Sequence, residues 1–199
     1  MRLDRDRLPT AGRRGQRSGA KPMIRQRGFT LMELMVTLAI VAIAIGMALP
    51  GFQDVKRRNL IVGEANHISA ALSQARAHAI KTRRDVRMCP STDASTCSGT
   101  DWAGGWIMFA DIDDSGSPTA AELLRVGDTV NPLLSLTAAA NFSNWLEYKP
   151  SGRAIGSGGT FTGTFSVCSG DYHDYSRQIG LSAVGRVSTE KVPNICANN

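Results

Sequence analysis

A single acidic residue, Glu33, stands at the start of a long apolar run, where its position predicts an ion pair with a chain terminus. Residues 25–34 read RQRGFTLMEL, so a basic stretch ends at Gly28, Phe29 opens the apolar run, and Glu33 is its only ionisable side chain. A carboxylate inside a membrane costs about 2.5–3.5 kcal/mol on insertion scales and normally has a functional reason. Cleavage after Gly28 would create a new α-amine on Phe29, and the Glu33 carboxylate of a neighbouring subunit could pair with it. In a low-dielectric bundle of helices, such a pair would fix the axial register between subunits.

A second group of oxygen-bearing side chains has the spacing of a calcium-binding loop. Asp111, Asp113, Ser115 and Glu122 match the pattern D-x-D-x-S-G-x5-E, which puts oxygen donors at the intervals of such a loop. The flanking residues, however, are typical of strands rather than helices, and Pro118 lies inside the loop. The sequence therefore favours an acidic hairpin turn, with a calcium site as the alternative.

Four cysteines, all after the predicted helix, indicate disulfide bonds rather than a metal centre. The Cys-x-x-Cys pattern is absent, and no histidine stands at zinc-ligand spacing from them. An even number of cysteines downstream of a membrane segment fits an oxidising compartment such as the periplasm. We favour the pairs Cys89–Cys97 and Cys168–Cys196, although the sequence leaves all three connectivities open.

The remaining candidates for chemistry do not form a catalytic set. His67 and His78 lie on a predicted helix and His173 in a predicted loop, and none has a serine or cysteine neighbour that suggests a nucleophile–base pair. We therefore expect no enzymatic activity, no cofactor and, apart from the calcium alternative, no metal.

The residues after Gly28 predict the first half of one long helix. Residues 34–49 carry no charge, and residues 29–50 would extend about 33 Å as a helix. This is enough to cross a bilayer core of about 30 Å. Pro50 comes where the apolar run ends and is expected to interrupt or kink the helix.

Residues 53–84 predict an amphipathic second half of the same helix. Apolar side chains recur at spacings of three and four, which forms one stripe: Ile61, Ala65, Ile68, Leu72, Ala75 and Ala79. Polar side chains, among them Gln74 and Arg76, are expected on the opposite, solvated face.

After Asp85 the sequence changes to short β-like runs separated by turn residues. Seven runs are expected to be strands: 86–89, 105–111, 123–126, 145–149, 160–168, 178–183 and 186–188. Consecutive strands after a helix are typical of an α+β fold. We therefore predict a long N-terminal helix, transmembrane and then amphipathic, packed on an antiparallel β-sheet domain.

The junction at Gly28 resembles a known processing signal. Gly-Phe-Thr-Leu-x-Glu followed by a charge-free helix closely resembles the type III signal of type IV prepilins and type II secretion pseudopilins. The resemblance implies a type IV pilin-like fold, cleavage between Gly28 and Phe29 by prepilin peptidase, and methylation of the new amine. It also implies that Glu33 is the glutamate used in assembly and that Pro50 is the helix-kinking proline of the family.

The C-terminal half is similar to one branch of this family, the GspH/FimT group of minor pilins and pseudopilins. The segments that carry the likeness are ARAHAIKTRRDVRMC, GGWIMFADIDDSG, EYKPSGRAI, GTFSVCS and RQIGLSAVGRVS. The resemblance implies a structural subunit that assembles into or primes a type IV pilus or a type II secretion pseudopilus. Its partners would be other pilins or pseudopilins, bound through the N-terminal helix.

Some pilus members of this group bind DNA, and the charge distribution bears on that alternative. The chain has a net charge of +6, but residues 1–28 alone carry +7 and the rest is net −1. Binding to phosphates depends on clustered lysine and arginine, which the globular part lacks. The DNA-binding members use a C-terminal Gly-Arg-x-Arg; here Arg186 is present, whereas Ser188 replaces the second arginine. A DNA-binding minor pilin acting in DNA uptake, with Arg186 as a contact, is the alternative function.

These observations predict four segments: a cleaved basic leader at 1–28, a transmembrane and filament-core helix at 29–52, an amphipathic helix at 53–84 and a periplasmic β-rich domain at 85–199. The precursor is expected to cross the inner membrane once, with the basic leader on the cytoplasmic side, and later to join a filament. A secretory signal peptide cut near residues 46–48 and a plain membrane anchor are alternatives, but they leave Glu33 unexplained.

Overall fold

The computed structural model of the chain describes residues 28–170 and 175–196, without the side chains of residues 48–50. The predicted leader, except for Gly28, therefore lies outside the described residues. His173 also lies outside them. The chain divides into two compact units, Met1–Ile45 and Gly46–Asn199. All of the β strands in the described residues belong to the second unit.

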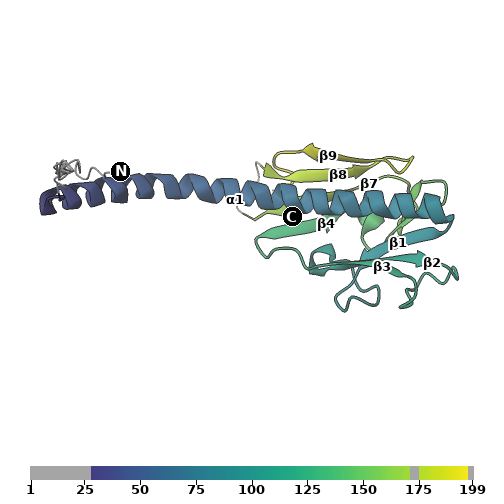
Figure 1. Cartoon of the computed structure of the whole chain (residues 1–199). Coiled ribbons are helices and arrows are strands. Elements are labelled where there is room, and N and C mark those ends of the chain that lie inside the picture. The colour runs from purple at the N-terminus through teal and green to yellow at the C-terminus, as the bar shows by residue number, and fades with distance from the viewer. Residues whose placement is uncertain (1–27, 171–174, 197–199) are drawn as a thin grey trace, which may run out of the picture. The chain divides into compact units, whose positions relative to one another are not determined.

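The long helix predicted for residues 29–84 is α1 (Leu31–Thr82), drawn in Figure 1. It begins after Thr30, whose side-chain oxygen accepts a hydrogen bond from the backbone N–H of Glu33 (3.2 Å). It ends before Arg83, which has a φ of 56°, because this left-handed conformation cannot continue the helix. The backbone stays helical through Pro50, so α1 is not interrupted there. The kink expected at Pro50 stays a prediction.

The described part of the second unit contains two antiparallel sheets. The first has the strand order β3-β2-β1-β5-β6 and is made of β1 (Asp85–Pro90), β2 (Trp106–Asp111), β3 (Leu123–Gly127), β5 (Leu146–Tyr148) and β6 (Ala154–Gly156). The second has the order β4-β7-β8-β9 and is made of β4 (Leu134–Ala138), β7 (Gly163–Ser169), β8 (Arg177–Leu181) and β9 (Val187–Lys191). Two short 3-10 helices lie in the connections, η1 (Trp102–Gly104) and η2 (Ala140–Phe142).

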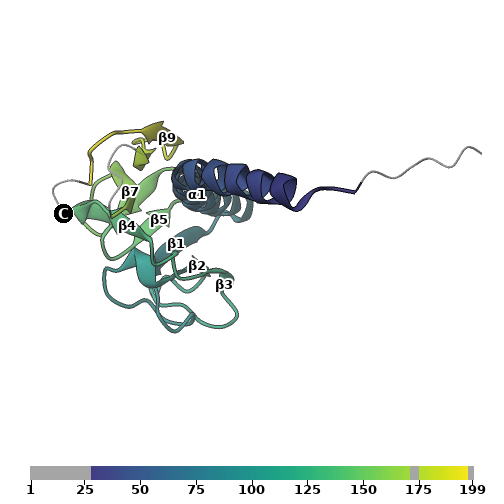
Figure 2. The same ribbon diagram turned by 90° about the vertical axis from the view of Figure 1, so that its left-hand side faces the viewer.

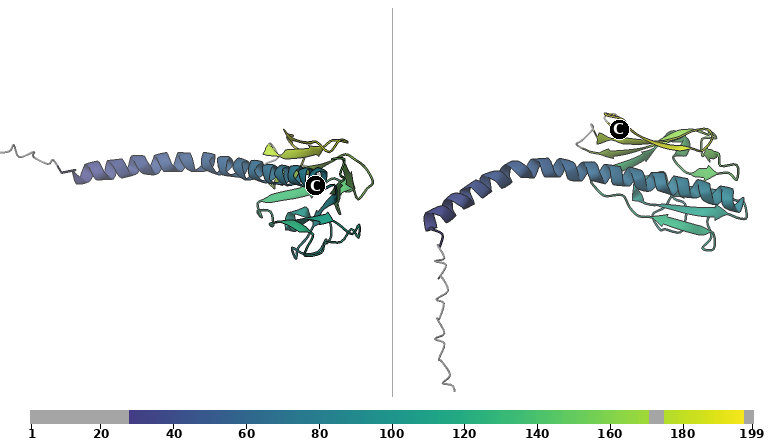
Figure 3. Two further views of the ribbon diagram at one scale, coloured as in Figure 1. Left: turned by 45° about the vertical axis from the view of Figure 1, so that its right-hand side comes forward. Right: turned by 45° about the horizontal axis from the view of Figure 1, so that its top comes forward.

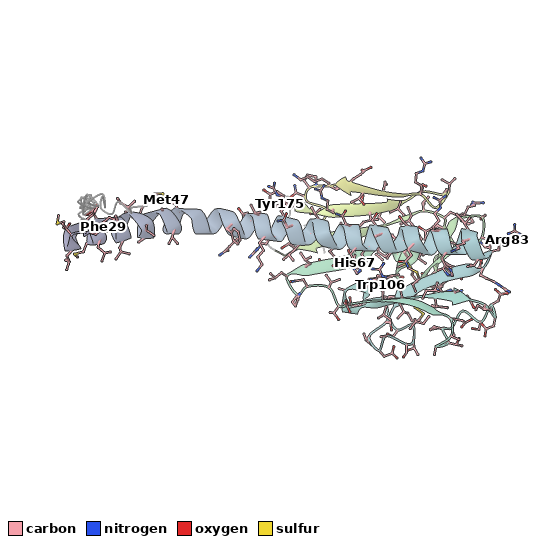
Figure 4. The ribbon with its side chains drawn as sticks, in the orientation of Figure 1. Phe29, Met47, His67, Arg83, Trp106 and Tyr175 are labelled. Carbon is pink, nitrogen blue, oxygen red and sulfur yellow. A yellow bond between two sulfur atoms is a disulfide. The ribbon has the colours of Figure 1, made fainter. Side chains whose placement is uncertain are left out.

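The C-terminal part of α1 packs against both sheets. The right-hand view of Figure 3 shows the two sheets on opposite sides of this helical segment, and Figure 2 shows the same arrangement nearly along the helix. Leu72 of α1, Met88 of the first sheet and Phe165 of the second belong to one continuous core cluster. Figure 4 shows His67 of α1 beside Trp106 of β2, with their ring centroids 5.8 Å apart.

The apolar stripe predicted on the second half of α1 is buried at all six positions, and Ala71 joins it. The solvated face predicted for the polar residues is confirmed for Gln74, whose side chain is exposed, whereas Arg76 is half-buried. Arg76 donates hydrogen bonds to the carbonyl oxygens of Gly152 and Val184, both at 3.0 Å. Gln74 accepts one from Arg125 (2.9 Å). Arg76 is therefore also used in packing, because it satisfies backbone carbonyls in the turns that follow β5 and β8.

The α+β class is confirmed, but the sheet structure is richer than predicted. β4 and β6 were not expected. The sequence of β4, LSLTA, runs into three further residues AAN without a turn signal, and β6 is only three residues long and contains Gly156. Both strands are defined by pairing, β4 with β7 and β6 with β5. Such tertiary contacts are not present in a local pattern.

Candidate processing and assembly site

The residues predicted to be processed stand directly before α1. Gly28, Phe29 and Thr30 lie outside the helix. The side-chain oxygen of Thr30 accepts from the Glu33 N–H (3.2 Å), and its carbonyl oxygen accepts from the Leu34 N–H (3.1 Å). Thr30 is therefore the N-cap residue of α1, and Glu33 occupies the third helical position.

Glu33 thus stands in a local sequence motif that the sequence prediction did not include. A threonine at the N-cap with a glutamate three residues later is the capping-box pattern. A carboxylate in the first turn also interacts favourably with the helix dipole, typically by about 0.3–1 kcal/mol. The signal was present in the sequence, because Thr30-x-x-Glu33 directly precedes the charge-free run.

Neither Gly28 nor Phe29 is held in place by the rest of the described chain. A Cβ atom added at Gly28 would meet no atom within 4 Å, and its φ is not in the left-handed region. The fold itself therefore does not require glycine at this position. The side chain of Phe29 is 81% exposed. Any requirement for these residue types must come from something that binds the chain.

The helix of the first unit presents an apolar surface. Figure 4 labels Phe29, from which this run of side chains starts. Large apolar side chains are exposed along the helix at Leu31, Met32, Leu34, Met35, Val36, Leu38, Ile40, Val41, Ile43 and Ile45. α1 is long and apolar enough to cross a membrane, with a mean hydropathy of 2.3 over its most apolar 18 residues. Such a surface is favourable in lipid or against apolar surfaces of other chains.

The carboxylate of Glu33 is exposed within this surface. No residue in the described ranges forms an ion pair with it. The capping bond to the hydroxyl of Thr30 is donated by the backbone N–H of Glu33 and does not involve this carboxylate. The side chain is therefore available to a partner outside the folded chain.

The second unit holds two disulfides, Cys89–Cys97 and Cys168–Cys196. These are the pairings favoured by the sequence. The first joins β1 to the segment after it, and the second joins β7 to the segment after β9. Each disulfide is expected to raise the free energy of unfolding by about 2–4 kcal/mol, because it restricts the unfolded chain.

The acidic loop joins β2 to β3 and brings three of its four predicted ligands together. Carboxylate oxygens of Asp111, Asp113 and Glu122 lie within 4.8 Å of one another. Ser115 is not part of this group, and its hydroxyl donates to the carbonyl oxygen of Ser117 (3.1 Å). The segment is also the acidic connection between antiparallel strands that the sequence favours.

Arg186, the candidate DNA contact, lies in the turn between β8 and β9 and is exposed. Its backbone N–H donates to the hydroxyl of Ser182 (3.1 Å). Gly185 has a φ of 74°, and a Cβ atom there would overlap the carbonyl oxygen of Gly152. Packing of the turn thus explains the glycine of this Gly-Arg pair without any DNA contact.

A long N-terminal helix, apolar and exposed in its first part and packed on antiparallel sheets in its second, is the architecture of a type IV pilin-like subunit. Residues 64–185, more than half of the chain, match the family described as type II transport protein GspH, and the chain belongs to this family. Residues 23–49 match the prokaryotic N-terminal methylation motif.

Similar proteins come from Pseudomonas aeruginosa. Two relatives named fimbrial protein are 27% identical over 119 residues, which cover 60% of this chain and 71% of each relative. A crystal structure of the type IV minor pilin FimU matches with a TM-score of 0.54 at 24% identity. The match covers 67% of this chain and 90% of the FimU chain. For a second crystal form of FimU the TM-score is 0.51 at 23% identity, and the match covers 65% of this chain and 92% of the FimU chain. The fold is thus that of a minor pilin, and the family and fimbrial relatives support a structural role as a pilin or pseudopilin.

Proposed function

We propose that the chain is the membrane-anchored precursor of a minor pilin or pseudopilin. Prepilin peptidase cuts it between Gly28 and Phe29 and methylates the new amine. The subunit then packs with other pilins or pseudopilins through the first part of α1, in a type IV pilus or a type II secretion pseudopilus, and performs no catalytic step. The observation that carries the proposal is the exposed apolar helix directly after the processing junction. It supports the proposal because such a helix needs lipid or neighbouring helices around it.

The proposal places the precursor in the inner membrane with a single crossing. The basic leader, net +7, stays on the cytoplasmic side, following the excess of Lys and Arg in cytoplasmic segments. The β domain then lies in the periplasm. The two disulfides of this domain support a periplasmic location, because disulfides persist in oxidising compartments.

In the proposed assembly, Glu33 pairs with the α-amine of Phe29 in a neighbouring subunit. The availability of its carboxylate in the folded chain supports this pairing. Between apolar helices an unpaired carboxylate is costly to bury. An amine of the neighbouring subunit at the same position along the helix axis removes that cost. Only one axial offset between neighbouring helices brings the two charges together, so the pair fixes the register.

The test separates the intermolecular role of Glu33 from its capping role. Glu33→Gln keeps a residue type that is compatible with the capping box but removes the charge. Thr30→Ala removes the cap and keeps the charge. The measurement is the fraction of subunit recovered with sheared filaments, or cross-linked to neighbouring pilins, relative to the fraction in the membrane. We expect Glu33→Gln to insert normally but to lose most of its incorporation, and Thr30→Ala to retain it.

The opposite pattern would refute the pairing. If Glu33→Gln incorporates like the unchanged protein while Thr30→Ala fails, Glu33 acts only as a helix cap. Cleavage of each variant is followed by its electrophoretic mobility, so that a processing defect is not mistaken for an assembly defect.

A further inference from the structure

The loop between β2 and β3 gathers three carboxylates in a small space. Asp111 ends β2, Glu122 directly precedes β3, and Asp113 lies in the loop between them. One oxygen from each lies within 4.8 Å of the others. Two oxygens bound to the same calcium ion at 2.3–2.6 Å are separated by at most about 5 Å. The three side chains therefore already lie within the span of one calcium coordination sphere.

The buried carboxylate of Asp111 has one oxygen without a partner. Its Oδ2 accepts a hydrogen bond from the backbone N–H of Gly116 (3.0 Å). Its Oδ1 is buried, in a residue that is only 4% exposed, and has no hydrogen-bond partner. A buried acceptor left unsatisfied is costly and calls for an explanation. A cation held between the three carboxylates would give the buried Asp111 carboxylate a further partner and leave the Gly116 bond intact.

The other two carboxylates are oriented by hydrogen bonds within the loop. Oδ1 of Asp113 accepts from the Ser115 N–H (3.1 Å). Oε1 of Glu122 accepts from the Ile112 N–H (2.8 Å), and Oε2 accepts from the N–H and hydroxyl of Thr119 (3.0 and 2.7 Å). Carboxylate oxygens accept more than one bond. The loop therefore aims these groups without using up their capacity to bind a cation.

The local charge balance leaves a net negative loop. Two arginines approach the loop: Nη2 of Arg87 is 3.8 Å from Oδ2 of Asp111, and Nη1 of Arg84 donates to the carbonyl oxygen of Ile112 (3.4 Å). The Arg87 guanidinium is bound more closely to Glu147, at 2.6 and 2.8 Å. These two arginines, one of them shared with Glu147, do not balance three converging carboxylates.

From these contacts we propose that the β2–β3 loop is a calcium site, with Asp111, Asp113 and Glu122 as ligands. The donors are all oxygen, as hard cations require, and the flexible, incomplete set suits calcium better than magnesium. Water would supply the remaining ligands. Strands flank the loop where a calcium-binding EF-hand has helices, so the likeness extends to the loop alone. The bound ion would hold the end of β2 to the start of β3.

The test uses the full chain in detergent micelles, stripped with a chelator and titrated with calcium alone by calorimetry. Asp113→Asn removes one exposed ligand charge without disturbing the buried Asp111. Asp114→Asn is the matched control, because it makes the same change at the next, exposed position, and asparagine tolerates the φ of 55° there. We expect one calcium per chain for the unchanged protein and Asp114→Asn, and a dissociation constant raised at least about tenfold by Asp113→Asn, since charge count tunes such loops.

Two results would overturn the site. One is the absence of binding by the unchanged protein up to about 1 mM calcium, the weak end of the range for extracellular modules. The other is an equal loss of affinity in Asp113→Asn and Asp114→Asn, which would show a diffuse charge effect rather than ligation. Because the measurement needs neither processing nor assembly, its outcome is independent of the proposed filament role.

Discussion

Glu147, on β5, is a buried carboxylate held by two cations, one from β1 and one from the residue directly after β5. Arg87 bonds to it through Nε (2.8 Å) and Nη2 (2.6 Å), and the Nζ of Lys149 lies 2.6 Å from its other oxygen. Burial alone would raise the pKa of Glu147, but the hydrogen bonds from Lys149 and Arg87 outweigh it, so the pKa lies below its ordinary value. The ionised form is therefore stabilised by folding.

This network predicts a pH-dependent contribution to stability. Replacing Glu147 by glutamine should lower the free energy of unfolding by about 1.5–3 kcal/mol at neutral pH, because hydrogen bonds to charged groups are lost. A depressed carboxyl pKa contributes stability above its unfolded value, near 4.5, and loses it as the pH falls through the folded value. The difference between the two proteins should therefore shrink below about pH 4.5. Urea unfolding in micelles, followed by tryptophan fluorescence at each pH, measures this difference in the free energy of unfolding.

The control for this prediction is Glu190→Gln, the same change on an exposed side chain of β9. Glu190→Gln should leave stability within about 0.5 kcal/mol of the unchanged protein. A Glu147→Gln deficit that does not change between neutral and acid pH would contradict the assigned ion pairs.

At the scale of the element, α1 uses the same residue types for two different purposes. Leu72 is 0% exposed and belongs to the core of the second unit, whereas Leu38 is 60% exposed in the first unit. Both lie in one uninterrupted helix. The helical period identified the buried stripe, and the absence of charge identified the apolar run. Neither pattern shows that Arg76 bonds to Gly152 and Val184, because those carbonyls come from turns distant in sequence.

Leucine-to-alanine substitutions in the two parts of α1 should therefore have different effects. Leu72→Ala should lower the free energy of unfolding of the β domain by about 2–5 kcal/mol, the loss expected for a buried leucine with its cavity. Leu38→Ala should leave that stability unchanged. Unfolding followed by the fluorescence of the buried Trp102 and Trp106 reports on the domain. Equal destabilisation by both variants would contradict this division of the helix.

For the whole molecule, the sequence predicted the order of parts better than their internal connections. Fold class, helix length and the stripe could be derived from periodicity, charge and spacing, whereas the sequence favoured the two cysteine pairs without excluding the other connectivities. The division into two sheets could not be derived, because the short strands β4 and β6 are set by pairing with β7 and β5. At the junction, the type of residue at positions 28, 29 and 33 was informative, whereas the N-cap role of Thr30 became clear from its contact with Glu33.

The central claim is that the working subunit begins at Phe29, so that the apolar helix starts with a new amine four residues before Glu33. The direct measurement is the intact mass and N-terminal sequence of the protein extracted from membranes and from filaments. The account predicts a chain that starts at Phe29 and carries one added methyl group. A mature chain that keeps Met1, or one cut after residue 48, would contradict it, because neither places an amine where Glu33 can pair with it.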